Sequence, residues 1–110
     1  MSCRSNYYDK EQTKLRAKIY KNSNDEYHRE DGPAWIEYYE NGNLNYEGYY
    51  INGMHHREDG PAWIEYYENG SIKKEYYIIN GKPRLNENGR PTIIDYNKDG
   101  NVFIKYRYYY

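Results

Sequence analysis

Two identical tetrapeptides contain the residues of this chain that could do chemistry. They are His28-Arg29-Glu30-Asp31 and His56-Arg57-Glu58-Asp59. A histidine next to two carboxylates supplies the groups used in general acid–base catalysis. Histidine and aspartate are also common ligands of metal ions. These residue types therefore raise two hypotheses, a catalytic site and a metal site, each present in two copies.

The spacing of the ligands argues against the metal site. His55, His56 and Asp59 supply three candidate ligands. Neighbouring side chains on an extended chain, however, point to opposite sides, so His55 and His56 do not converge. No further His or Cys completes a coordination shell. We therefore expect neither a metal nor a cofactor.

The catalytic hypothesis is also weak. A histidine and two carboxylates are available in almost any surface loop, and an enzyme rarely builds one active site by tandem duplication of a hairpin. The chain has no phosphate-binding loop of the form GxxxxGK[ST], no GxSxG and no CxxC. Nucleotide hydrolysis, serine esterase and zinc-finger functions therefore lack support. We expect no catalytic residue and no enzymatic activity.

A structural role in turns suits the tetrapeptides better. In the following Gly32-Pro33, the glycine tolerates a positive φ and the proline fixes its own φ, which turns the chain sharply. Asp31 can accept backbone N–H hydrogen bonds at this turn. His28 or Arg29 is expected to lie against a Tyr or Trp of the adjacent unit, as a stacking or cation–π contact.

The tetrapeptides belong to a longer repeat. HREDGPAWIEYYENG occupies residues 28–42 and, unchanged, residues 56–70, which gives a spacing of 28 residues. A third copy begins at Arg90 after a small insertion, and LRAKIYKNSND from Leu15 resembles a degenerate half-unit. We assign a capping segment to residues 1–14 and a single repeat domain to 15–110. Its units cover about 15–31, 32–59, 60–88 and 89–110.

Each unit has two β-rich runs separated by Asn-Gly or Asp-Gly, which is a strong hairpin signal. The predicted fold is all-β, with tandem antiparallel hairpins in one elongated twisted sheet. A three-residue loop ending in a left-handed Gly42 would place Tyr38 opposite Leu44 and Ile36 opposite Tyr46. The same loop in the later copies would place Ile94 opposite Ile104 and Glu65 opposite Lys73. We assign structural turns to Asp31, Gly32, Pro33, Gly42, Gly53, Asp59, Gly60, Pro61, Gly70, Gly81 and Gly100. The best helical candidate, Lys10–Lys18, would form no more than a short turn.

The two faces of the predicted strands differ. The Ile-x-Tyr face persists in the third copy as Ile94 and Tyr96, which is typical of a core. The opposite face carries Trp-Glu-Tyr and is a candidate binding surface, with partial packing under a neighbouring hairpin as the alternative. The C-terminal YRYYY is a candidate last strand, or a strand added to a partner's sheet. The candidate partner-binding residues are Trp35, Glu37, Tyr39, Trp63, Glu65, Tyr67, Tyr108, Tyr109 and Tyr110.

Composition and charge limit the class of protein. Cys3 is the only cysteine, so no intrachain disulfide forms and a reducing compartment such as cytoplasm is expected. No apolar run indicates a signal peptide or a membrane span. Residues 1–22 and 71–110 are basic, whereas residues 23–70 carry two Arg against eleven acids. The pattern fits solvated faces, or association of a basic end with the acidic middle.

HRxDGPA, followed by a Tyr- and Trp-rich strand and an NG turn, resembles the degenerate MORN-type repeats over residues 15–108. Related patterns occur in the bacterial YwqK-like MORN repeat variants and in HRxDGPA arrays of phages and giant DNA viruses. The resemblance implies stacked hairpins that act as a scaffold or binding surface, and the AT-rich codon bias favours a giant-virus source. The chain lacks the shorter unit and Gly-x-Gly spacing of ordinary MORN repeats, so lipid-headgroup binding does not carry over.

These observations favour a non-enzymatic module for protein–protein interaction or scaffolding in the host cytoplasm or a virion. Self-association through edge strands or the C-terminal strand is expected, because an open array leaves edges uncovered. The alternatives are an antitoxin or inhibitor of an enzyme, and a virion structural component. Single-stranded nucleic acid is disfavoured as a partner: basic and aromatic residues do mix near Lys73 and Lys105, but the middle is acidic.

Overall fold

The computed structural model describes residues 2–106 of the chain, in which twelve β-strands and no helix occur. The candidate contact residues Tyr108–Tyr110 lie outside the described residues. The strands are β1 (Ser2–Tyr7), β2 (Leu15–Lys21), β3 (Trp35–Tyr38), β4 (Leu44–Gly48), β5 (Tyr50–Ile51), β6 (Met54–His55), β7 (Trp63–Tyr66), β8 (Ile72–Tyr76), β9 (Ile78–Ile79), β10 (Lys82–Pro83), β11 (Thr92–Tyr96) and β12 (Val102–Tyr106).

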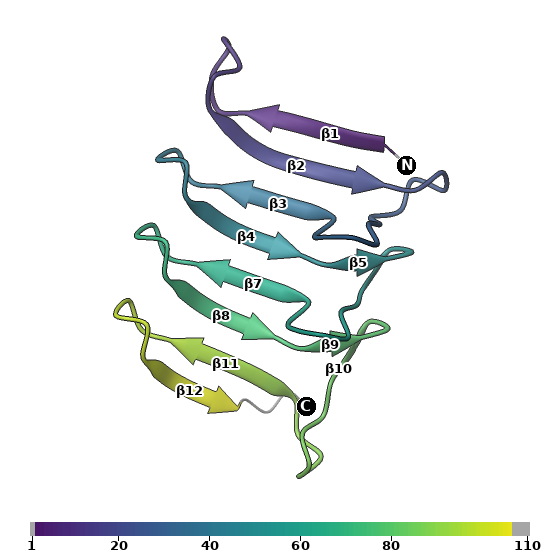
Figure 1. Ribbon diagram of the computed structural model, residues 1–110, viewed down its shortest axis with the longest axis vertical. Helices are drawn as coiled ribbons and strands as arrows, with labels where there is room; N and C mark the ends of the chain where they lie inside the picture. The colour runs from purple at the N-terminus through teal and green to yellow at the C-terminus, as the bar shows by residue number, and fades with distance from the viewer. Residues whose placement is uncertain (1, 107–110) are drawn as a thin grey trace.

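Eight of these strands form a single antiparallel sheet. Its order is β1-β2-β3-β4-β7-β8-β11-β12, so four long hairpins follow one another across the sheet (Figure 1). The short hairpins β5–β6 and β9–β10 extend from the side of the sheet opposite the long-hairpin turns (Figure 1). The molecule measures 49 × 37 × 23 Å. The predicted all-β class and antiparallel sheet are confirmed.

The N-terminal segment does not form the helical turn considered for Lys10–Lys18. Residues from Leu15 onward already belong to β2, which pairs with β1. The intervening turn is held by the Asp9 carboxylate, which accepts hydrogen bonds from the backbone N–H of Thr13 (3.0 Å) and of Lys14 (2.9 Å). A short acidic side chain that caps its own turn competes with helix formation. This turn returns the chain so that β1 pairs with β2 and is the first strand of the sheet.

The predicted loops of the long hairpins are confirmed. Gly42, Gly70 and Gly100 have φ values of 90°, 93° and 86°, which an L side chain rarely adopts. In the first loop, Gly42 N–H donates to Tyr39 O (2.9 Å), and Tyr39 N–H donates to Asn43 O (2.8 Å). The expected turns at Gly53 and Gly81 close the short hairpins, also with positive φ.

Below each loop, however, the predicted register is wrong by one residue. Tyr38 lies opposite Leu44 as predicted, but Ile36 lies opposite Glu47 instead of Tyr46. A β-bulge follows the loop and adds a residue to the second strand, which inverts the pairing parity from there on. For the same reason Glu65 lies opposite Lys74 instead of Lys73, with 4.0 Å between Oε2 and Nζ.

The third long hairpin contains a corresponding bulge. Asp95 there lies opposite Ile104, where Ile94 was predicted. As in the other long hairpins, the second strand has one extra residue after the loop, here between Val102 and Ile104. The predicted alternation of side chains between the two faces therefore fails at the same place.

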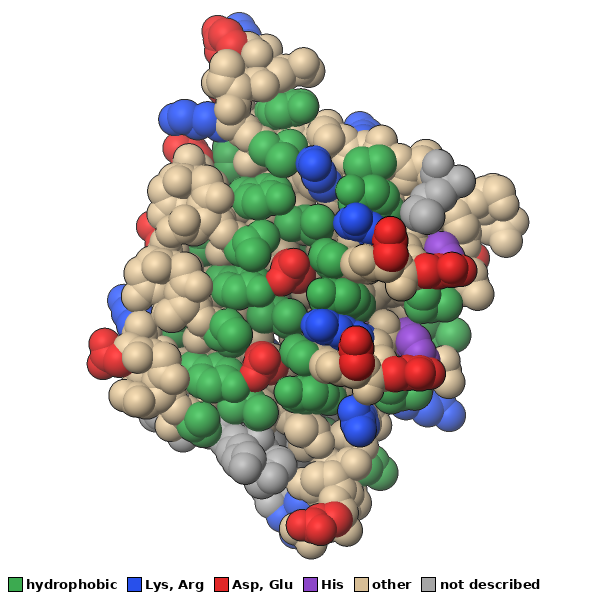
Figure 2. Space-filling model, in the orientation of Figure 1, with side chains coloured by type: hydrophobic (Ala, Val, Ile, Leu, Met, Phe, Trp, Pro, Cys, Tyr) green, Lys and Arg blue, Asp and Glu red, His purple; other side chains and the backbone are tan. Residues whose placement is uncertain are grey.

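The core of this thin sheet is divided between its two faces. Ile36 and Ile64 are buried on the Ile-x-Tyr face, as predicted. On the other face Ile93 is 0% exposed and more buried than Ile94, so the prediction of one core face is only half right. Figure 2 shows one face, where hydrophobic side chains, tyrosine included, gather over the strands with acidic side chains among them. Tyrosine suits this arrangement because its ring is buried while its hydroxyl reaches a polar partner.

Candidate interaction surface

The two HREDG segments form equivalent loops, each of which bonds to the units before and after it. His28 N–H donates to Tyr20 O (3.0 Å), and Arg29 N–H donates to Tyr50 O (3.1 Å). In the second loop, His56 N–H donates to Tyr49 O (3.0 Å), and Arg57 N–H donates to Ile78 O (3.2 Å). Each loop therefore ties three successive parts of the array together through its backbone.

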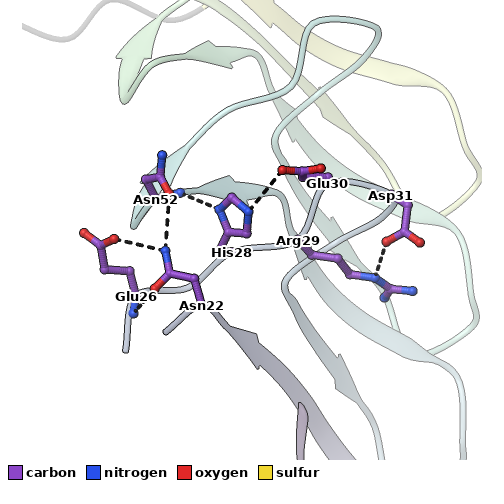
Figure 3. A network of polar contacts seen from close by, with 7 residues as sticks. All are labelled: Asn22, Glu26, His28, Arg29, Glu30, Asp31 and Asn52. Carbon is purple, nitrogen blue, oxygen red and sulfur yellow. Dashed lines mark hydrogen bonds and ion pairs between the residues drawn. The ribbon is translucent and has the colours of Figure 1, made fainter. Parts of the chain in front are cut away.

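The histidine of each loop caps the next short hairpin. His28 Nδ1 accepts the backbone N–H of Asn52 at 2.9 Å, as Figure 3 shows, and His56 Nδ1 accepts that of Asn80 at 3.0 Å. Both asparagines have positive φ, 48° and 50°, at the turns that they cap. An accepting Nδ1 puts the proton of the neutral ring on Nε2, which lies 3.6 Å from Glu30 in the first loop.

The arginine of each loop lies over a tyrosine, as the sequence predicted. The Cζ atoms of Arg29 and Arg57 are each 4.1 Å from the ring centroids of Tyr20 and Tyr49. In the first loop, Nε donates to Asp31 Oδ1 at 3.1 Å (Figure 3), and Nη1 donates to the carbonyl of the proline at position 33, at 3.3 Å. The Asp31 carboxylate thus binds the guanidinium, where backbone N–H groups were predicted as its donors.

The glycine after each aspartate makes room for this guanidinium. Neither Gly32 nor Gly60 has a positive φ, which corrects the predicted reason for these glycines. A Cβ at Gly32 would lie 3.0 Å from Arg29 Cζ, and one at Gly60 would lie 2.8 Å from Arg57 Cζ. The residue is therefore small because an arginine crosses it.

A groove of about 680 Å³ separates the two loops. Tyr49 and Ile51 contribute to its lining between the loop residues. The four loop carboxylates at its edges are the most exposed of these groups, with side chains 82%, 84%, 84% and 89% exposed for Glu30, Asp31, Glu58 and Asp59. Figure 2 shows acidic, basic and histidine side chains gathered along this side of the sheet. Four carboxylates surround two arginines, so the rim is acidic.

The predicted Trp-Glu-Tyr stripe is mainly engaged in contacts within the chain. Trp35 Nε1 donates to Glu37 at 2.8 Å, and Trp63 Nε1 donates to Glu65 at 2.8 Å. Trp35 also meets Tyr27 edge-on, with 5.0 Å between ring centroids. The tryptophans are half-buried, so they pack under neighbouring segments, the alternative that the sequence had left open.

Trp63 belongs to an aromatic cluster that sequence reasoning missed. Its ring centroid lies 5.4 Å from that of Tyr46 and 5.3 Å from that of His55. His55 also lies 4.0 Å from the ring of Tyr50. Burial lowers the pKa of His55, and its Nδ1 is buried with no hydrogen-bond partner in the described structure. Neither sequence neighbour of His55 is Phe, Tyr or Trp, so no local pattern indicated this packing.

The tyrosines of the stripe hold successive hairpins together. Tyr39 Oη donates to Tyr66 O at 2.6 Å, and Tyr67 Oη donates to Tyr96 O at 2.8 Å. These residues were predicted to lie on a binding face, whereas their hydroxyls join neighbouring hairpins. The signal was present in the paired tyrosines of YYENG, because the second one always directly precedes the loop.

A further set of tyrosines donates to carboxylates on the Ile-x-Tyr face. Tyr66 Oη donates to Glu47 at 2.5 Å, and Tyr96 Oη donates to Glu75. Burial and these hydrogen bonds raise the pKa values of both phenols. Two glutamates that would otherwise be costly among apolar side chains are thereby satisfied.

In the described part of the chain, no three His, Cys, Asp or Glu side chains are grouped so that they could hold a metal ion. The same residues include no helix with the length and apolar character needed to cross a membrane. Comparisons with protein family models, with curated proteins and with solved structures found no match.

Proposed function

We propose that this chain is a non-enzymatic repeat module that binds another protein along the groove between its HREDG loops. One observation carries the proposal: the imidazole and guanidinium groups of both loops are bound within the molecule, whereas the loop carboxylates are exposed. A catalytic group needs access to its substrate, and these have partners already. Asp31 and Asp59 each accept an arginine N–H, but carboxylates that are more than 80% exposed still have oxygens available for donors on another surface.

The chemistry of the groove supports a protein partner over an anionic one. Tyrosine and arginine are enriched in protein interfaces, and Tyr49 with the two loop arginines contributes to this lining. Phosphates of nucleic acids or lipid headgroups would meet four carboxylates at the rim and be repelled. A partner with basic side chains complements this charge.

Pairing between copies is a second candidate, favoured by the open edge of the sheet. Five of the six residues of β1 are exposed, and β1 has no neighbour on its outer side in the described sheet. Residues 1–22 carry six Lys or Arg against two acids, so this basic end complements the acidic loops of another copy. Sedimentation of the purified chain at several concentrations separates this candidate from binding to a different protein.

The groove is tested by charge reversal at exposed positions. The variant Glu30→Lys/Glu58→Lys changes the rim, and Glu40→Lys/Glu68→Lys is its control at the exposed turns of the long hairpins, with the same 28-residue spacing. Affinity capture with cross-linking from the native cell or virion should recover the partner with the control and lose it with the rim variant. Equal recovery by both variants would contradict the groove as the site. Phosphatase, nuclease or hydrolase activity of the pure chain would contradict the non-enzymatic assignment.

A further inference from the structure

Three tyrosines occupy equivalent places beside the loops. The backbone carbonyls of Tyr20, Tyr49 and Tyr77 each accept the N–H of the residue that begins the loop. The distances are 3.0 Å from His28, 3.0 Å from His56 and 2.9 Å from Arg84. The third loop thus attaches to the sheet as the first two do, and its residues can be compared with theirs position by position.

The position that supplies the stacked arginine differs in the third loop. Arg29 and Arg57 follow the first residue of their loops, and each lies 4.1 Å from a tyrosine ring centroid. Leu85 takes this position in the third loop. The backbone of Leu85 pairs with that of Pro91, whereas Arg29 and Arg57 donate side-chain hydrogen bonds to the carbonyls of Pro33 and Pro61. Leu85 is 58% exposed and has no charge.

Tyr77 consequently lacks the stacked cation that its two counterparts have. Among the described residues, no Lys or Arg lies over the Tyr77 ring in the way that Arg57 lies over Tyr49. The neighbouring Arg84 is directed to the preceding loop, where Nη1 donates to Glu58 O at 3.4 Å. Burial raises the pKa of Tyr77, the Glu75 carboxylate adds to this shift, and the Arg57 and Arg84 guanidiniums oppose it.

We propose that Tyr77 receives an arginine side chain of the partner protein, placed over its ring as Arg57 is placed over Tyr49. The inference rests on the proposed function and names the chemistry of the partner. The molecule itself shows that this tyrosine position accommodates a guanidinium, twice and with the same geometry. An arginine of the partner over Tyr77 would repeat the cation–π contact that the chain makes at Tyr20 and Tyr49.

A dye-labelled peptide, acetyl-Gly-Arg-Gly-Arg-Gly, tests this site by fluorescence anisotropy, with a citrulline peptide of the same length as the neutral control. Leu85→Arg places a guanidinium over Tyr77 within the chain, and Leu85→Gln is the matched neutral change at the same exposed position. We expect Leu85→Arg and Tyr77→Leu each to raise the Kd of the arginine peptide about fivefold. Leu85→Gln should leave it unchanged.

Several outcomes would overturn the inference. They are equal binding of the citrulline peptide, or a Kd that Leu85→Arg and Tyr77→Leu both leave unchanged. If the peptide binds only to the Arg107→Ala variant, the occupant of the Tyr77 ring would be Arg107 of the same chain, which lies outside the described residues. The proposed function is judged separately by capture. If Tyr77→Leu captures the partner as well as the wild type does, the groove is supported and the arginine site is not. Loss of capture by the rim variant alone leads to the same conclusion.

Discussion

The hydroxyl of Tyr39 donates a 2.6 Å hydrogen bond to the backbone carbonyl of Tyr66, in the next long hairpin of the sheet. Tyr67 makes the corresponding bond to Tyr96. Adjacent hairpins are therefore joined near their loops by side chains as well as by strand pairing. The loops at the opposite ends of the strands supply histidine and arginine for the same purpose. Contacts between neighbours at both ends of each hairpin thus hold a sheet that has little core.

Removal of one such hydroxyl should destabilise the molecule measurably. Tyr39→Phe leaves the ring but removes the bond to Tyr66 O, so we expect the free energy of unfolding to fall by about 1 kcal/mol. Urea denaturation followed by fluorescence measures this change. Tyr7→Phe, at an exposed tyrosine of β1, is the control and should have no effect. Equal stability of both variants would show that the bond contributes nothing net.

The glycine beneath Arg57 should tolerate a methyl group only if the arginine moves. Gly60→Ala places a Cβ 2.8 Å from the guanidinium carbon, and loss of the contact with Tyr49 should reduce the free energy of unfolding by about 1 kcal/mol. In an Arg57→Gln background the same alanine should cost little. A double-mutant cycle in urea measures the coupling, and an unchanged cost in that background would rule out this explanation of the glycine.

His55 should make the fold sensitive to mild acid. Burial lowers its pKa in the folded state, so the unfolded chain binds the proton more readily. Stability should therefore decrease as the pH falls below the unfolded value of about 6.5, and stop decreasing below the folded pKa. Urea midpoints between pH 8 and pH 5 measure this effect. His55→Phe should flatten the curve relative to wild type, and parallel curves would assign the dependence to other groups.

The buried phenols should produce the opposite dependence in alkali. Burial raises the pKa of Tyr66, and its hydrogen bond to Glu47 adds to the shift. The unfolded chain ionises first, so the stabilisation is complete below the unfolded pKa of about 10 and is lost as pH rises beyond it. Denaturation at increasing pH should show a smaller loss for Tyr66→Phe than for wild type. An equal loss of stability for Tyr66→Phe and wild type would contradict the assignment.

The strands and loops were predictable from local signals. Asn-Gly and Asp-Gly dipeptides flanked by Tyr and Ile specify hairpins, and Gly42 has the positive φ that its loop requires. The bulge below each loop was not predictable, because it depends on how both strands fit their neighbours. Its one-residue shift changed the partner of Glu65 from Lys73 to Lys74.

The candidate site was predictable in part. The contact between arginine and tyrosine followed from residue types, whereas the role of Gly32 required the path of the arginine above it. The Trp-Glu-Tyr stripe was recognised as a pattern, but its engagement with neighbouring hairpins depends on the β5–β6 segment that packs beside it. The partner contacts predicted for this stripe are still a prediction.

Because each HREDG loop bonds only to the units directly before and after it, no contact in the described sheet fixes how many units the chain must have. The β4–β7 and β8–β11 junctions are made by corresponding strands. An additional copy of residues 32–59 inserted after residue 59 would therefore meet the same neighbours on both sides. Gene duplication could lengthen the molecule one unit at a time without redesigning its interior, and each added unit would extend the reach of its acidic side.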